Sequence, residues 1–237
     1  MLLLNKVVLG TLAFSLLAGC ATAPKKMAFN KEMASQIKTV SIVQEENQAK
    51  YPVRIMAHVG ANFGLIGAAI AEADMAAKTS KLHNKIAPHQ INIQEKVTQS
   101  LKTRLESNGY EVNLIKLPAK TADKQALVVA SNLTTADSIL VLKTQSGYVA
   151  AGSNSPYLPV ITVNANLYDR KTQKLNYQET VNYGLQTAGN DAIQIDANPQ
   201  YQFKNIDELM KQPQKTSAAL TDGIEPITEK LASDLKR

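Results

Sequence analysis

Residues 161–183 read ITVNANLYDRKTQKLNYQETVNY and contain two stretches in which apolar residues occupy alternate positions. The apolar series of the first stretch is Ile161, Val163, Ala165 and Leu167. The second series is Leu175, Tyr177, Val181 and Tyr183, with Glu179 at the middle position. Because successive side chains of a strand point to opposite faces, the two stretches predict a β-hairpin that turns at residues 169–174. Its other side is rich in Asn and Thr, so we expect that face to be hydrated or to contact a partner.

Further strands are predicted on both sides of the first long helical pattern. Residues 138–144 (SILVLKT) form a continuous apolar run that is typical of a buried strand. Alternating or β-branched stretches predict three more, at residues 38–43, 51–59 and 110–114. Two segments predict loops, namely residues 147–156 (GYVAAGSNSP) and the polar, turn-rich residues 187–203.

Three helices are predicted from the spacing of apolar residues. The first lies within residues 89–108, ends at Asn108-Gly109, and has one apolar face made of Ile93, Val97, Leu101 and Leu105. Thr121 can cap a second helix that precedes the buried strand. The last helix is expected to bend or restart at Pro226, and its apolar face consists of Leu220, Ile224, Ile227, Leu231 and Leu235.

This order of elements predicts an α/β (α+β) fold with a mixed or antiparallel sheet and helices packed on one face. Three phrases carry a family resemblance: LESNGY at 105–110, ADSILVL at 136–142 and VNANLYD at 163–169, which Thr172 and Leu175 follow. They resemble the bacterial envelope lipoproteins of the YajG, LptE and CsgG type, whose domains are similar to the amino-terminal domain of TolB. The resemblance covers about residues 90–185 and implies a TolB N-terminal-domain-like fold.

Residues 60–88 depart from that pattern and are interpreted as an inserted Gly/Ala-rich helical segment. Gly disfavours a helix, so three Gly within eight residues need an explanation. One explanation is a smooth face for close helix packing, formed by Gly60, Gly64, Gly67, Ala68 and Ala71. The other is a turn with a Gly at positive φ, followed by an ordinary buried helix. Both interpretations are kept.

The first twenty residues predict a secretory signal. Lys6 precedes an apolar run at 7–18 that would rise about 18 Å as a helix, well short of the ~30 Å hydrocarbon core of a bilayer. The stretch Leu17-Ala18-Gly19-Cys20 then resembles the lipobox of bacterial lipoproteins, and Cys20 is the only Cys in the chain. The resemblance implies that Leu17, Ala18 and Gly19 form the signal-peptidase recognition site and that Cys20 is lipidated. In that family Ala21 implies export to the outer membrane.

The predicted organisation is therefore a lipoprotein signal peptide at 1–19, a lipidated tether at 20–33 and a single periplasmic domain at 34–237. The tether begins with small and polar residues and contains a Pro. Several alkyl chains on Cys20, at ~0.8 kcal/mol per buried CH₂, would form a stable membrane anchor.

Composition argues against several function classes. The 26 basic and 20 acidic residues give a net charge of +6, but no Lys/Arg cluster exceeds two residues, which disfavours nucleic-acid binding. The His residues, at positions 58, 83 and 89, lack a helical metal-ligand spacing. Ser35 and Lys38 match Ser-x-x-Lys, a spacing used in acyl transfer, but no Lys-Thr-Gly follows. We therefore expect no metal, no cofactor and no enzymatic activity.

Two hypotheses for the function remain. The first is a non-catalytic binding or assembly module for an envelope protein complex, which docks another envelope protein or a second copy of itself. The second is a periplasmic carrier or sensor of a small envelope molecule, in which the loops at 147–156 and 187–203 close a pocket.

Overall fold

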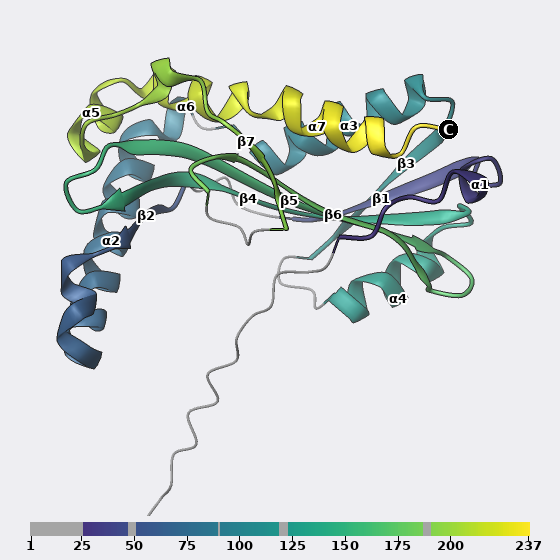
Figure 1. Ribbon diagram of the computed structural model, residues 1–237, viewed down its shortest axis with the longest axis horizontal. Coiled ribbons are helices and arrows are strands. Elements are labelled where there is room, and N and C mark those ends of the chain that lie inside the picture. Colours follow the sequence, from purple (N-terminus) through teal and green to yellow (C-terminus); the bar gives the residue numbers. More distant parts are fainter. Residues whose placement is uncertain (1–25, 47–50, 90, 119–122, 187–190) are drawn as a thin grey trace, which may run out of the picture.

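The computed structural model describes residues 26–46, 51–89, 91–118, 123–186 and 191–237. A twisted, seven-stranded mixed sheet forms its centre, with helices α3, α6 and α7 lying along one face (Figure 1). The strands are β1 (Thr39–Glu45), β2 (Val53–Ala57), β3 (Glu111–Leu117), β4 (Ser138–Gly152), β5 (Tyr157–Asp169), β6 (Leu175–Gly184) and β7 (Ile193–Ile195). The α-helices are α1 (Lys31–Ala34), α2 (Gly64–Ile86), α3 (Ile93–Ser107), α4 (Asp123–Leu133), α5 (Ile206–Lys211), α6 (Pro213–Asp222) and α7 (Ile224–Asp234). Three 3₁₀ helices complete it: η1 (Val59–Phe63), η2 (Ala87–His89) and η3 (Pro199–Tyr201). The predicted mixed α/β fold is confirmed.

The predicted hairpin is formed by β5 and β6. The strands pair antiparallel, with Val163 opposite Val181 and Leu167 opposite Tyr177. At the turn, Asp169 Oδ1 accepts hydrogen bonds from the backbone N–H and the hydroxyl of Thr172, both at 2.7 Å. These two bonds, the backbone one first, lower the pKa of Asp169. The spacing Asp-x-x-Thr is therefore what turns the chain back at this point.

The central strand, β4, is longer than predicted. It pairs antiparallel with β5 from Ser138 to Ala150, so the expectation of a loop at 147–156 is wrong for its first six residues. Gly147 allows the strand to continue, because a Cβ there would lie 2.4 Å from the carbonyl oxygen of Pro52. A loop-like composition here reflects this close approach of β2.

The predicted long connection at 187–203 is also partly regular. Its described part contains β7 and η3, and it ends at Phe203, whose backbone exchanges two hydrogen bonds with that of Tyr157, at 2.7 and 3.0 Å. The Phe203 ring is fully buried and lies edge-to-face on Tyr148, with ring centroids 5.7 Å apart. Residues 191–203 thus extend the sheet and its core. A shallow hollow of about 390 Å³ lies where the two predicted loops meet, and it is lined by Asn154, Pro156, Gln202, Lys204 and Glu208.

The main core lies between the sheet and the helices above it. From α3, Val97, Leu101 and Leu105 point into it, as the spacing predicted. The last helix restarts at Ile224, after Gly223, which packs against the Tyr183 ring so closely that a Cβ would lie 2.5 Å from a ring carbon. Pro226 then sits in the first turn of α7, where a missing N–H is tolerated.

Helix α4 is the exception to the expected single helical layer. Ala126, Leu127 and Ala130 pack in a separate cluster with Val43 of β1 and with β4 side chains on the face opposite α3 and α7. The sheet is therefore covered on both faces at this end. Thr121, the predicted cap, lies outside the described residues.

The described part of the predicted tether, residues 26–33, packs on the sheet. The backbones of Met27 and Gln178 exchange two hydrogen bonds at the edge of β6, at 2.8 and 3.0 Å. Lys26 Nζ lies 2.8 Å from the buried carboxylate of Glu179, and the Phe29 ring packs on Tyr177. Residues 26–33 therefore belong to the folded domain. The predicted signal peptide and Cys20 lie outside the described residues.

Asp137 joins the starts of two neighbouring strands. Its Oδ2 accepts hydrogen bonds from the backbone N–H of Lys38 at 2.8 Å, and from the N–H and hydroxyl of Thr39, both at 3.0 Å. The Lys38 N–H is the main cause that lowers the pKa of Asp137. A lowered folded-state pKa means that the carboxylate stabilises the fold above its ordinary pKa near 3.9 and loses this effect as the pH falls through the lowered value.

We therefore expect Asp137→Asn to destabilise the domain by about 1 kcal/mol at pH 7, because the variant loses charge-assisted hydrogen bonds. The difference in melting temperature from the parent should shrink below about pH 4, where the parent carboxylate protonates as well. Thermal melts followed by circular dichroism at both pH values measure this. An equal difference in melting temperature at pH 7 and below pH 4 would contradict the role of the charge.

Candidate functional site

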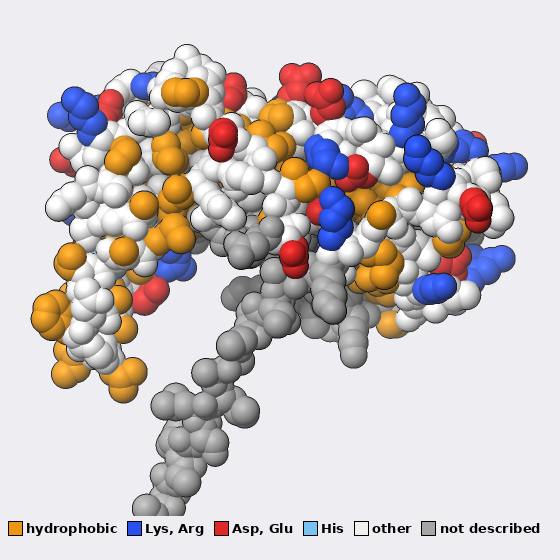
Figure 2. Space-filling view, viewed as in Figure 1, with side chains coloured by type: hydrophobic (Ala, Val, Ile, Leu, Met, Phe, Trp, Pro, Cys, Tyr) orange, Lys and Arg blue, Asp and Glu red, His pale blue; other side chains and the backbone are white. Residues whose placement is uncertain are grey.

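Helix α2 projects beyond the sheet as an arm. Figure 1 shows it running past β2 and ending clear of the other elements, and Figure 2 shows apolar side chains gathered at that end. We call residues 59–71, which comprise η1 and the first turns of α2, the tip. Leu65 is 91% exposed, Ile66 78% and Phe63 77%, and Val59 and Ile70 are exposed as well. The tip is therefore an apolar surface that no other described part of the chain covers.

Small residues let η1 fold back onto α2. Gly64 adopts φ 66°, so the predicted turn with a Gly at positive φ is present. A Cβ on Gly67 would lie 2.0 Å from the carbonyl oxygen of Gly60, so only Gly fits where the two elements cross. Of the predicted packing face, Gly60 and Gly67 are thus brought together, Ala71 is buried, and Gly64 and Ala68 are exposed.

The other interpretation, an ordinary buried helix after the turn, is wrong for the first turns of α2. One face of the helix is buried along its whole length, through Gly67, Ala71, Met75, Leu82 and Ile86. In the tip, Ile66 and Ile70 make the opposite face apolar as well. A helix that is apolar all round signals a second contact surface, and this signal is present in the sequence of residues 59–71. Sequence reasoning missed Phe63, Leu65 and Ile66 because it followed the Gly and Ala residues.

A hydrogen-bonded cluster holds the base of the tip. His58 Nδ1 accepts the backbone N–H of Gly60 at 3.0 Å, so in the neutral imidazole the proton lies on Nε2, which donates to Asp74 Oδ2 at 3.1 Å. Lys78 also bonds to Asp74. The Lys78 hydrogen bond, followed by the His58 contact, lowers the pKa of Asp74. The cluster thereby ties the start of η1 to α2.

A second ion pair joins β2 to α2 near this cluster. Arg54 Nη1 of β2 lies 2.9 Å from Glu72 Oε2 of α2. We call these five side chains the charged collar: Arg54, His58, Glu72, Asp74 and Lys78. No charged residue occurs within residues 59–71, so the charge changes abruptly from the collar to the tip.

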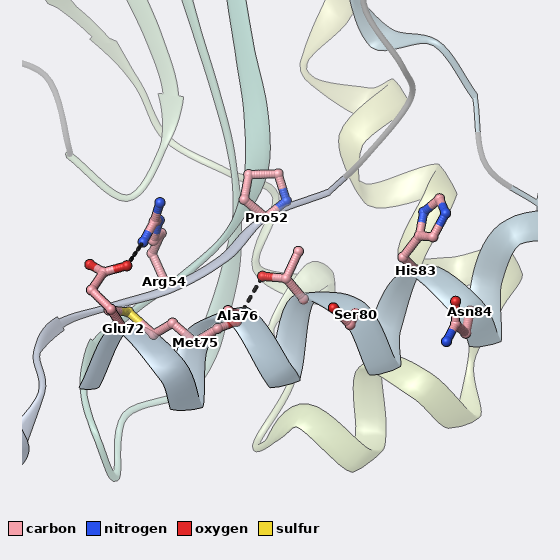
Figure 3. A pocket seen from close by; sticks show the side chains of 9 residues that line it. Pro52, Arg54, Glu72, Met75, Ala76, Ser80, His83 and Asn84 are labelled. Atoms are coloured by element: carbon pink, nitrogen blue, oxygen red, sulfur yellow. Dashed lines mark hydrogen bonds and ion pairs between the residues drawn. The ribbon is translucent and has the colours of Figure 1, made fainter. Parts of the chain in front are cut away.

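A shallow groove of about 360 Å³ lies between β2 and α2, next to the collar (Figure 3). The Arg54–Glu72 pair lies at one end, and His83 and Asn84 at the other (Figure 3). Thr79, on its wall, already donates to the Met75 carbonyl at 2.8 Å and accepts from the Val53 N–H at 2.9 Å. His83 Nδ1 is buried and has no hydrogen-bond partner among the described residues. The carrier hypothesis placed its pocket between the loops at 147–156 and 187–203, so this groove would be a different site for a small molecule.

The remaining candidate residues serve local structure. Ser35 Oγ donates to the Glu32 carbonyl at 3.0 Å at the end of α1. On the polar face of the hairpin, Thr162 donates to Asn182 at 2.8 Å and Thr180 donates to Asn164 at 2.7 Å. Within the part of the chain that the structure describes, no group of three or more His, Cys, Asp or Glu side chains could hold a metal ion. The lipobox residues and Cys20 precede the described residues.

Comparison with known proteins gives no family. No protein-family model matches the chain. No curated protein matches it either.

Solved structures with a similar arrangement exist at low similarity. The PelC dodecamer from Paraburkholderia phytofirmans is 14% identical, with a TM-score of 0.33 over 91% of this chain and 95% of that chain. A putative neuraminyllactose-binding hemagglutinin homolog from Helicobacter pylori is 12% identical, with a TM-score of 0.35 over 89% and 90%. The lipoprotein GNA1162 from Neisseria meningitidis is 13% identical, with a TM-score of 0.29 over 64% and 88%. These neighbours include a bacterial lipoprotein.

The Gly60–Gly67 contact can be tested by Gly67→Ala. The added Cβ would overlap the Gly60 carbonyl, so η1 must move away from α2. Overpacking costs ~1–3 kcal/mol, but η1 can yield locally without disturbing the core. We expect faster amide hydrogen exchange in residues 59–66 and nearly unchanged melting of the whole domain.

Ala68→Ser, at an exposed position of the same helix turn, is the matched control and should leave exchange in residues 59–66 as in the parent. Unchanged exchange in Gly67→Ala would show that η1 is not held by this contact.

Proposed function

We propose that this chain is a lipid-anchored cell-envelope protein that acts as a non-catalytic binding or assembly module for an envelope protein complex. The observation that carries the proposal is the exposed tip of α2. Clustered large apolar side chains in water mark contact surfaces on soluble domains. A domain that presents Phe63, Leu65 and Ile66 together at the end of an arm is built to be one part of a larger assembly.

The membrane location follows from the predicted lipobox. Lipidation of Cys20 anchors the chain, and Ala21 directs it to the outer membrane with the domain in the periplasm. In support of an anchored, folded domain, the structure holds Lys26 against Glu179 only six residue steps after Cys20. No described helix is long and apolar enough to cross a membrane.

A non-catalytic role is supported by the hydrogen bonds in which the candidate reactive side chains are already engaged. Both nitrogens of His58 are occupied, by Gly60 and Asp74, and the Asp169 carboxylate is engaged by Thr172. Ser35 ends a helix and has no base beside it in any contact of the described residues. These groups stabilise turns and helix ends.

The proposal predicts a specific protein partner in intact cells. The full-length chain with a carboxyl-terminal tag is treated with an amine-reactive cross-linker, extracted in detergent and purified by the tag. Residues 59–71 contain no Lys, so the reagent reports contacts of the rest of the domain. We expect one stoichiometric partner, either another envelope protein or a second copy of this chain.

Cys20→Ala is the matched control for the anchor. It should abolish lipidation and greatly reduce the capture, because the chain is no longer concentrated at the membrane. Recovery of no protein at defined stoichiometry from the lipidated parent would overturn the assembly function.

The alternative function, a carrier or sensor of a small envelope molecule, has the groove between β2 and α2 in its favour. A ligand that binds only the folded state raises the melting temperature, by the equivalent of about 2.7 kcal/mol at a hundredfold excess over Kd. The assembly proposal expects no such shift when envelope extracts depleted of protein are added to the purified chain. A shift that Ala76→Phe removes, by filling the groove, would favour the carrier.

A further inference from the structure

The folded domain is held close to the predicted lipid anchor. Because Met27 pairs with Gln178 and Lys26 pairs with the buried Glu179, the chain is fixed to the edge of β6 from Lys26 onward. Only six residue steps separate Lys26 from Cys20, and these span at most about 21 Å when fully extended. The edge of β6 therefore stays within roughly that distance of the lipid surface, whatever the conformation between them.

The tip has the chemistry of a surface that meets lipid. Asn62 is the only polar side chain within residues 59–71, and no charge occurs there. Protein interfaces carry about one hydrogen bond per 100–200 Å², which this surface offers few groups to form. The charged collar lies directly behind it and bears both signs of charge, as suits a headgroup layer.

The start of α2 limits how deep such a tip can go. Its capping position, Phe63, makes no side-chain hydrogen bond to the first backbone N–H groups of the helix. An N–H group at a helix start that lacks a protein acceptor is costly in the hydrocarbon core, whereas water or a headgroup oxygen can accept its hydrogen bond at the interface. A shallow position at the boundary of headgroups and acyl chains is therefore the one that fits.

We propose that the tip of α2 inserts into the bilayer that carries Cys20, with Phe63, Leu65 and Ile66 about 5–10 Å deep and the charged collar among the headgroups. The inference rests on the lipid anchor of the proposed function. Together the anchor and the tip hold the domain to the membrane at two points and fix its orientation.

The test uses the full-length lipidated chain in vesicles of phosphatidylethanolamine and phosphatidylglycerol. Cys20 is the only Cys and its sulfur is taken up by the lipid, so Leu65→Cys adds the single free thiol, which is labelled with a polarity-sensitive fluorophore. Val128→Cys, at an exposed apolar position of α4, is the matched control. Nitroxide groups on the lipid acyl chains quench a fluorophore that lies among them. We expect the label at position 65 to lose most of its fluorescence and the label at position 128 to keep it.

A label at position 65 that the lipid nitroxides do not quench would overturn membrane insertion. If that label is nevertheless shifted to the blue, a protein or a second copy covers the tip. A second variant, Leu65→Asp with the label at Ile66→Cys, should lose the quenching, since a charge is expelled from the acyl region. Its melting temperature should match the parent, because Leu65 is almost fully exposed.

The two proposals can fail separately. Capture of a partner through the lysines, together with an unquenched tip, would leave the assembly module standing without the membrane contact. Quenching at position 65 without any captured protein would support the membrane contact and overturn the assembly module.

Discussion

The fold depends on the pairing of β4 with two different strands along one of its edges. Its first part, Ser138–Val141, pairs with β1, and its last part, Tyr148–Gly152, pairs with β2, both in parallel. The opposite edge is hydrogen-bonded to β5 along nearly its whole length, so the pairing with β5 keeps both parts of β4 in one continuous strand. At Gly147 the Pro52 carbonyl comes so near that any side chain would separate β2 from β4. One glycine therefore allows the second parallel strand to join.

This division explains the arm. Because β2 ends at Ala57, opposite Gly152, the chain leaves the sheet there and must reverse. Gly64 and the Gly60–Gly67 contact make the reversal, and α2 returns over β2, accepting the Val53 N–H on Thr79 and the Ile55 N–H on Met75 Sδ. A strand of five residues is ~17 Å long, whereas a helix of 23 residues is ~34 Å long. The helix therefore extends beyond the strand that it covers. Helix α2 also contacts α5, α6 and η1, and the end of it that carries the tip lies clear of the sheet (Figure 1).

Sequence patterns were sufficient where a single periodicity decided the structure. The hairpin of β5 and β6, the helix α3 and the stop at Gly109 follow from local spacing, because each is specified by residues that are close in sequence. The carboxyl-terminal part of β4 could not be predicted, since Gly147 serves a contact with Pro52, far away in sequence. The same holds for residues 26–33, whose sequence carries no periodicity that would reveal the pairing of Met27 with β6. In the tip, the Gly residues serve packing within the chain, and the apolar residues between them face outward.

The tip is energetically separate from the core, and this separation is what a contact surface requires. The collar fixes its base through His58, Asp74 and Lys78, and the Gly60–Gly67 contact closes its end. Phe63, Leu65 and Ile66 contribute little to either, because most of their surface is in water. The stability of the fold therefore does not require apolar side chains at these three positions, and their exposure to water is unfavourable. A contact outside the isolated domain is the physical reason for their chemistry. Residues 26–29, which are held on β6, keep the domain within reach of the predicted anchor.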